Sequence, residues 1–155
     1  MAIDEKDLKI FIRSVSVYFQ KVFSEPALVD PPFLHGHEAV IRDVTGVIGI
    51  SGRHRGAVYF TTGRAMVREM LQALGVDPDD MDFAVDLVGE VTNTLAGNAR
   101  REFGSKFLIS VPTVIRSEQG KVSFPKNTKS FIIPFIWRHH RAHLIVCLTD
   151  VDAAS

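Results

Sequence analysis

The sequence predicts an α/β (α+β) sandwich in which long helices pack on a mainly antiparallel sheet. Helical periodicity covers residues 4–23 and 63–103, whereas β-branched residues and turn glycines dominate 40–62 and 108–149. The order is therefore helix, two strands, two helices, then three or four strands. Because strands and helices do not alternate along the chain, a parallel sheet of the Rossmann type is disfavoured.

Length and charge limit the class of protein. The 155 residues are enough for one domain with its own core, and we expect a single domain over 1–155. Lys plus Arg and Asp plus Glu each number 18, so the formal net charge is zero, which argues against bulk binding to nucleic acid or anionic membranes. No signal peptide is evident and no apolar stretch approaches the roughly 20 residues that span a bilayer, so we expect a soluble, cytoplasmic protein.

The first expected element is a helix over residues 4–23. Its apolar residues are spaced three and four apart, as on one helical face, at Leu8, Phe11, Val15, Phe19 and Val22. Pro26 favours an end just before it, because the residue preceding a proline avoids the helical region. Residues 26–37 hold three of the seven prolines and are expected to form a loop.

Two antiparallel strands are expected next, over residues 40–50 and 57–62, joined by a glycine-rich hairpin. Residues 63–74 then have helical spacing. Gly75 follows this segment directly and is a natural stop, since glycine readily adopts the left-handed conformation found after a helix.

A second, longer helix is expected from Asp77 to about Phe103. Asp77 is expected to cap its start, and Pro78 suits the first turn because its missing N–H needs no partner there. Gly104 marks the end of the helical pattern.

The last third of the chain has the pattern of strands. Residues 108–115 alternate, and Pro112 within them indicates an edge strand or a bulge. A short strand is expected over 122–124. Residues 131–137 and 142–149 are expected to form a second hairpin around a polar turn.

The long helix has a polar face with an unusual composition. On a helical wheel the core face holds Ala84, Leu87, Val88, Val91, Leu95 and Ala99. The opposite face holds Asp86, Glu90, Asn93, Gly97 and Arg100. Glu90 and Asn93 are three apart and are therefore neighbours on that face. Glycine within a helix costs about 1 kcal/mol relative to alanine, so Gly97 on the solvent side indicates close approach of another surface.

Three segments carry a likeness to a known family. They are the pattern Glu-x-x-Asn at Glu90–Asn93, followed by Gly97-Asn98-Ala99, and the flanking segments 43–52 and 110–115. Together they resemble the CheC/CheX/FliY chemotaxis phosphatases, in the same order and over most of the chain. A single motif is typical of CheX-like members, and the corresponding positions of the first helix, 12–16, lack a second Glu-x-x-Asn.

The resemblance implies a hydrolase that removes the phosphoryl group from the phospho-aspartate of a CheY-like receiver, the response regulator of two-component signalling. In the family the carboxamide orients the attacking water, which maps onto Asn93, and the carboxylate docks a receiver lysine, which maps onto Glu90. Asp86, Gly97 and Arg100 share the face and are expected to contact the partner. The receiver supplies Mg²⁺, so no cofactor is expected on this chain, and a homodimer is expected.

Other interpretations stay open at this point. The same fold serves as a non-catalytic receiver-binding or flagellar-motor adaptor in relatives that lack the catalytic pair, and retention of both Glu90 and Asn93 favours the enzyme. Asp86 and Arg100 can also be plain solvent charges or a local ion pair, and Gly97 can reflect tight helix packing. The sequence does not separate chemotaxis from another two-component pathway.

Histidine and cysteine do not predict a metal or redox site. The six histidines lack accompanying cysteine or carboxylate ligands at recognised spacing, and they are His35, His37, His54, His139, His140 and His143. The only cysteine, Cys147, lies in an apolar run, which predicts a buried and inert thiol and excludes a disulfide framework within the chain.

Overall fold

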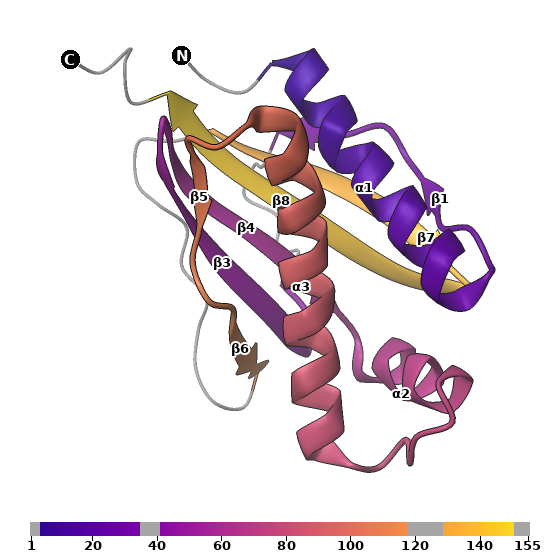
Figure 1. The fold of residues 1–155 in the computed structure, drawn as a ribbon. Helices are drawn as coiled ribbons and strands as arrows, with labels where there is room; N and C mark the ends of the chain where they lie inside the picture. The colour runs from indigo at the N-terminus through magenta and orange to yellow at the C-terminus, as the bar shows by residue number, and fades with distance from the viewer. Residues whose placement is uncertain (1–3, 35–40, 118–128, 151–155) are drawn as a thin grey trace.

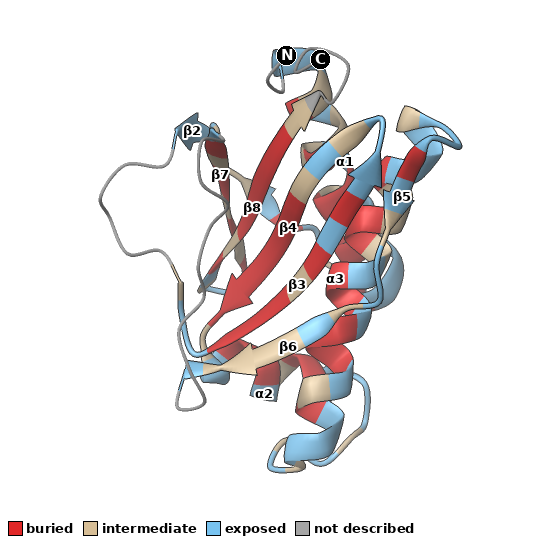
Figure 2. Cartoon of the chain, turned by 90° about the vertical axis from the view of Figure 1, so that its left-hand side faces the viewer, coloured by how far each residue is buried: buried red, intermediate tan, exposed pale blue. Residues whose placement is uncertain are grey.

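A computed structural model describes residues 4–34, 41–117 and 129–150 and confirms the predicted α+β class (Figure 1). Helices α1 (Glu5–Phe23) and α3 (Met81–Phe103) lie side by side on one face of the sheet, and α2 (Arg64–Ala73) lies at one end of it (Figures 1 and 2). The predicted strand at 122–124 lies outside the described residues.

All strand pairs among the described residues are antiparallel. The strand order is β1-β7-β8-β4-β3-β5, with β2 paired to β7 and β6 paired to β3. The strands are β1 (Leu28–Val29), β2 (Phe33–Leu34), β3 (Val44–Gly52), β4 (His54–Thr62), β5 (Phe107–Ile109), β6 (Thr113–Arg116), β7 (Ser130–Trp137) and β8 (His140–Asp150).

Helix α1 begins and ends where the sequence predicts. Asp4 caps its start, because the Asp4 carboxylate accepts from the Asp7 backbone N–H at 2.9 Å and the Asp7 side chain accepts in return. The expected apolar face is buried except for Val22, which is 42% exposed. Phe23 is buried at this turn instead, with its ring centroid 4.9 Å from that of Trp137.

Helix α3 begins later than the sequence predicts. Its N-cap is Asp80, whose carboxylate accepts from the backbone N–H groups of Asp82 and Phe83. Asp77 instead closes a turn, accepting from the Asp79 N–H at its side chain and from the Asp80 N–H at its carbonyl. The segment holds several aspartates, and the one nearest the continuous helix supplies the cap.

The hairpin between β7 and β8 is tighter than predicted. Its turn consists of Arg138 and His139 alone, with φ angles of 49° and 73°, and Trp137 already pairs with His140. Two consecutive residues with positive φ match the right-handed twist of the strands on either side, which is why such turns join hairpins. Arg138 also forms ion pairs with Glu25 and Glu69.

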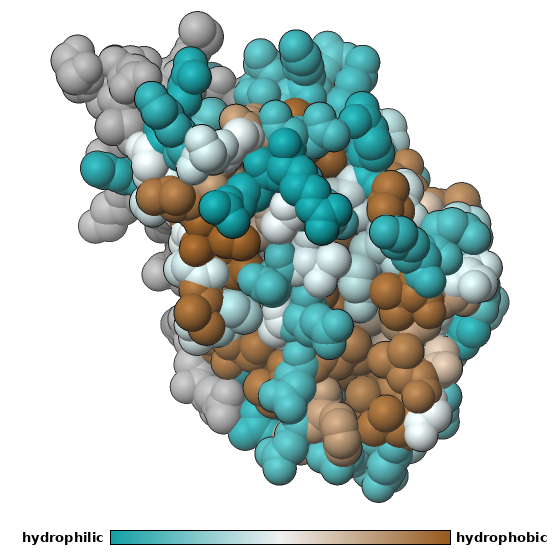
Figure 3. Space-filling model, in the orientation of Figure 1, coloured by the Kyte–Doolittle hydropathy of each residue, from teal (hydrophilic) through white to brown (hydrophobic). Residues whose placement is uncertain are grey.

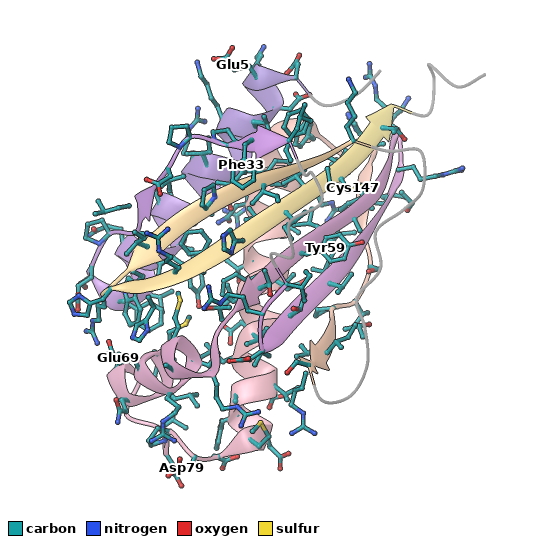
Figure 4. All side chains as sticks on the ribbon, turned by 180° about the vertical axis from the view of Figure 1, so that it is seen from behind. Glu5, Phe33, Tyr59, Glu69, Asp79 and Cys147 are labelled. Carbon is teal, nitrogen blue, oxygen red and sulfur yellow. The ribbon has the colours of Figure 1, made fainter. Side chains whose placement is uncertain are left out.

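Most of the core lies between the sheet and the helices. A smaller apolar cluster occupies the opposite face of the sheet and includes Tyr59 and Cys147, which Figure 4 labels from that side. Cys147 is fully buried, as predicted. None of the helices in the described part of the chain is long and apolar enough to cross a membrane.

Candidate functional site

The polar face of α3 lies where the helical wheel places it. All six residues predicted for the core face are buried. Asp86, Glu90, Asn93 and Arg100 are exposed, and Gly97 is half-buried. Neither Glu90 nor Asn93 makes a side-chain hydrogen bond or ion pair with another residue that the structure describes. Both polar groups are therefore available to a partner.

A close contact with the sheet sets the distance between α3 and β3 beside Glu90 and Asn93, the candidate pair. A Cβ atom added at Gly46 of β3 would overlap Thr92 Oγ1 and lie 3.2 Å from the Val88 carbonyl oxygen. Thr92 is fully buried, and its hydroxyl donates to that same carbonyl at 2.7 Å. Because Thr92 lies between Glu90 and Asn93 in the sequence, this contact determines how far both side chains project.

Helix α1 supports α3 from the side. The buried Ser14 hydroxyl donates to the Leu95 carbonyl at 2.9 Å, which ties the middle of the two helices together. Tyr18 is also buried, and burial raises the pKa of its phenol, with a further rise caused by the negative charge of Glu90. Tyr18 therefore stays neutral and adds no second negative charge beside the exposed carboxylate of Glu90.

A bulge in the neighbouring edge strand borders the pair. Ile109 is opposite Ile50 and Thr113 is opposite Val47, so residues 110–112 face only residues 48–49. Ser110 fastens the bulge, since its Oγ accepts from the Gly49 N–H at 2.8 Å and its own N–H donates to the Gly49 carbonyl at 2.9 Å. Among the described strands, β5 ends the strand order and the bulge follows it, so the edge strand or bulge predicted from Pro112 is confirmed.

Two hollows flank Asn93 along the helix. One, of about 690 Å³, lies between α3 and the bulge and is lined in part by Asp86, Glu90, Asn93, Ser110 and Val111. The other, of about 550 Å³, lies toward the end of α3 and is lined in part by Asn93, Gly97, Arg100, Arg101 and Ser105. Figure 3 shows the polar strip that follows α3, with hydrophobic surface on both sides. Asn93 belongs to both hollows and so lies at the centre of this surface.

The structure distinguishes between the open interpretations of individual residues. A Cβ atom added at Gly97 would meet nothing within 4 Å, so tight packing within the chain does not explain this glycine. Arg100 Nε donates to the Phe107 carbonyl at 3.1 Å, which anchors its guanidinium over the end of β5 rather than in a local ion pair. Asp86 makes no ion pair with any other described residue.

Sequence reasoning missed two residues that the structure places at the hollows. Arg101 lines the hollow at the end of α3, and Val111 lines the hollow beside the bulge. Arg101 could have been found from the sequence, because it directly follows Arg100. The outward direction of Val111 could not, because it depends on a bulge that is defined by pairing with β3. Among the described residues, no group of three or more His, Cys, Asp or Glu side chains could hold a metal ion.

The fold and the site together define an α+β domain that presents a carboxylate and a carboxamide one helical turn apart on an open face. Residues 44–136 match the family described as "Chemotaxis phosphatase CheX". The chain belongs to this family.

Solved structures support the same fold. A CheC-like superfamily protein from Shewanella sp. PV-4 superposes with a TM-score of 0.84 at 22% identity, covering 95% of this chain and 99% of that one. The chemotaxis protein CheX of Vibrio vulnificus gives 0.83 at 25% identity, with 93% and 99% covered. The Borrelia burgdorferi CheX in a complex with CheY, BeF3 and Mg gives 0.76 at 18% identity, with 92% and 97% covered. No curated protein matches the sequence.

Proposed function

We propose that this chain is a phosphatase that hydrolyses the phospho-aspartate of a CheY-like receiver. The observation that carries the proposal is the pair Glu90 and Asn93, exposed together on a helix that is held against both the sheet and α1. Membership of the chemotaxis phosphatase family supports it. So does the Borrelia burgdorferi relative, which is similar in fold and forms a complex with CheY.

In the proposed reaction, a water molecule attacks the phosphorus in line with the bond to the receiver aspartate. A new P–O bond forms to the water oxygen, the bond to the aspartate breaks, the aspartate leaves as a carboxylate, and the water proton passes to phosphate or solvent. The Asn93 carboxamide can both donate and accept, which lets it hold the water and stay close to the phosphoryl oxygens. A carboxylate at this position would repel them.

The remaining residues are proposed to dock the partner. Glu90 lies one helical turn before Asn93, and its exposed carboxylate is placed to pair with a lysine of the receiver. Asp86, Gly97 and Arg100 border the two hollows and extend the contact surface. We propose that the Mg²⁺ needed for the reaction is held by the receiver, since the charge to be neutralised lies on its own aspartyl phosphate.

The decisive experiment is phosphate release from a receiver phosphorylated with acetyl phosphate in the presence of Mg²⁺. Asn93→Ala is expected to lower the accelerated rate by about 100-fold, since a positioned catalytic group contributes about that much. The free energy of unfolding should change by less than about 0.5 kcal/mol, because the side chain is exposed. Gln20→Ala, which removes an exposed carboxamide from α1, is the matched control and should keep the wild-type rate.

Glu90→Gln separates docking from chemistry. It should raise KM with a smaller effect on kcat, and the difference should shrink at high salt, because it removes an ionic contact. If wild-type protein binds the phosphorylated receiver without accelerating phosphate release, the chain is an adaptor and not an enzyme. If Asn93→Ala keeps the wild-type turnover, the carboxamide does not orient the attacking water.

Family membership also leads us to infer that the protein acts in the cytoplasm, together with its receiver, and that it forms a homodimer. Light scattering on the purified chain, whose mass is 17.2 kDa, tests the second inference directly. A mass of twice this value is expected, and a monomer at all concentrations would contradict it.

A further inference from the structure

The exposed face of α3 has an ordered distribution of charge. Asp86 and Glu90 lie in its first half, the neutral Asn93 and Gly97 follow, and Arg100 and Arg101 lie in its last turn. Acidic residues near the start of a helix and basic residues near its end complement the helix dipole, so part of this order serves α3 itself. The two ends of this surface nevertheless carry opposite charges, and a docking partner has to carry the complementary charges at the matching positions.

Arg101 has no local role that would explain its position. It is exposed, lines the hollow that begins at Asn93, and also lines a smaller hollow of about 160 Å³ between α1 and α3. It pairs with no other residue in the described part of the chain, although the neighbouring Glu102 lies 3.7 Å from Arg13. Its guanidinium is thus a cation available at the rim of the candidate surface.

Val111 lies on the other side of Asn93. Its side chain is 84% exposed, more than that of Leu108 on the preceding strand β5, which is 45% exposed. The bulge that carries it is fixed by two hydrogen bonds between Ser110 and Gly49, and Pro112 restricts the backbone that follows. Because the backbone at Val111 is already fixed, less conformational freedom is lost when a partner covers its side chain.

Resting on the proposed function, we propose that the receiver docks across both hollows in one orientation, with Val111 as its apolar contact and Arg101 as its ionic contact to an acidic group. The two residues border opposite hollows that meet at Asn93, so one folded partner that reaches Asn93 covers both. The partner therefore presents a basic group toward Asp86 and Glu90 and an acidic group toward Arg101. Val111 and Arg101 are positioning residues that do not touch the phosphoryl group.

The two contacts are separated by their response to salt. With a CheY-type receiver phosphorylated by acetyl phosphate, Val111→Ser should lower kcat/KM about tenfold through KM, equally at low and high salt, because burial of an apolar side chain is lost. Arg101→Gln should lower kcat/KM about threefold at low salt. Its effect should disappear near about 1 M salt, where the screening length is about 3 Å. In both variants kcat should stay at the wild-type value.

Matched controls come from surfaces away from α3. Leu28→Ser removes an apolar side chain that is 66% exposed on β1, at the opposite edge of the sheet. Lys21→Gln removes an exposed cation from the last turn of α1. Both should keep the wild-type kcat and KM. Circular dichroism should show an unchanged fold in all four variants, since each replaces an exposed side chain.

Failure of this inference and failure of the proposed function give different results. If wild-type protein does not accelerate phosphate release, the proposed function is wrong. If it does, and Val111→Ser and Arg101→Gln behave like the two controls, the docking orientation is wrong. An Arg101→Gln effect that persists at high salt would overturn the ionic contact alone, and a fall in kcat with KM unchanged would overturn the positioning role of either residue.

Discussion

Gly46→Ala tests whether the contact between β3 and α3 controls the position of the candidate pair. The added methyl group would overlap Thr92 Oγ1 and lie 3.0 Å from Thr92 Cβ. Thr92 is fully buried and its hydroxyl is bonded to the Val88 carbonyl, so the side chain cannot swing into open space. The helix has to move away from the sheet, and it carries Glu90 and Asn93 with it.

The magnitude follows from the cost of overpacking a core. One extra methyl group in a well-packed interior destabilises a protein by about 1–3 kcal/mol. For a chain of this size each kcal/mol lowers Tm by about 2–4 °C, so a fall of roughly 2–12 °C is expected. Thr92→Ala removes the overlapping oxygen. The double variant Gly46→Ala/Thr92→Ala should therefore be more stable than the sum of the two single effects by about 1 kcal/mol or more.

Urea unfolding of the four proteins gives this coupling energy as a double-mutant cycle. The slope of the free energy with urea should be the same in all four, which shows that the unfolded state is unchanged. Phosphate release from the phosphorylated receiver is measured in parallel. Activity should fall in Gly46→Ala and recover in part in the double variant, because the helix returns toward the sheet.

Two outcomes would refute the reasoning. If the single effects on stability add within about 0.5 kcal/mol, Gly46 and Thr92 do not compete for the same space. Alternatively, Gly46→Ala loses stability and the double variant regains it, but activity does not change in either. In that case the distance between α3 and the sheet does not control the activity of Glu90 and Asn93.

Two further predictions concern pH. The only tyrosines, Tyr18 and Tyr59, both have a raised pKa, chiefly because of burial, and that of Tyr59 is about 12. The folded protein should show no tyrosinate absorbance near the ordinary value of 10.0, and its stability should fall as the pH rises above that value; titration of either tyrosine at pH 10 with the fold intact would contradict this. Hydrogen bonds from His140 and Arg138 lower the pKa of Glu69 below 4.5. The stability that these bonds give the folded protein is complete above pH 4.5 and is lost as the pH falls through the lowered pKa. Glu69→Gln should therefore flatten the dependence of the urea midpoint on pH between about 3 and 5, and an unchanged slope would show that the cluster does not contribute.

Local sequence signals predict the helices and the face that α3 exposes. The spacing of Glu90 and Asn93 is enough to make them neighbours, because three residues span nearly one turn of a helix. Gly104 and Asp4 end and begin helices through their own backbone preferences and hydrogen bonds. Where several candidates compete, as at Asp77 and Asp80, the same rules find the region of the cap and miss the residue.

Features that depend on distant pairing were beyond local rules. The contact between Gly46 and Thr92 joins positions far apart in the sequence, and nothing around Gly46 alone indicates which side chain will face it. Pro112 indicates a bulge, but the outward direction of Val111 follows from the pairing of residues 110–112 with β3. The roles of the candidate residues stay predictions, since they concern a partner and not the fold.

The whole candidate surface comes from one uninterrupted stretch of chain. Helix α3, the two hollows that meet at Asn93 and the bulge all lie within residues 81–116, and they rest on β3 at Gly46 and Gly49 and on α1 at Ser14. A substitution on the outer side of this stretch therefore alters the candidate surface without touching the pairing of β4, β7 and β8, which come from other parts of the chain.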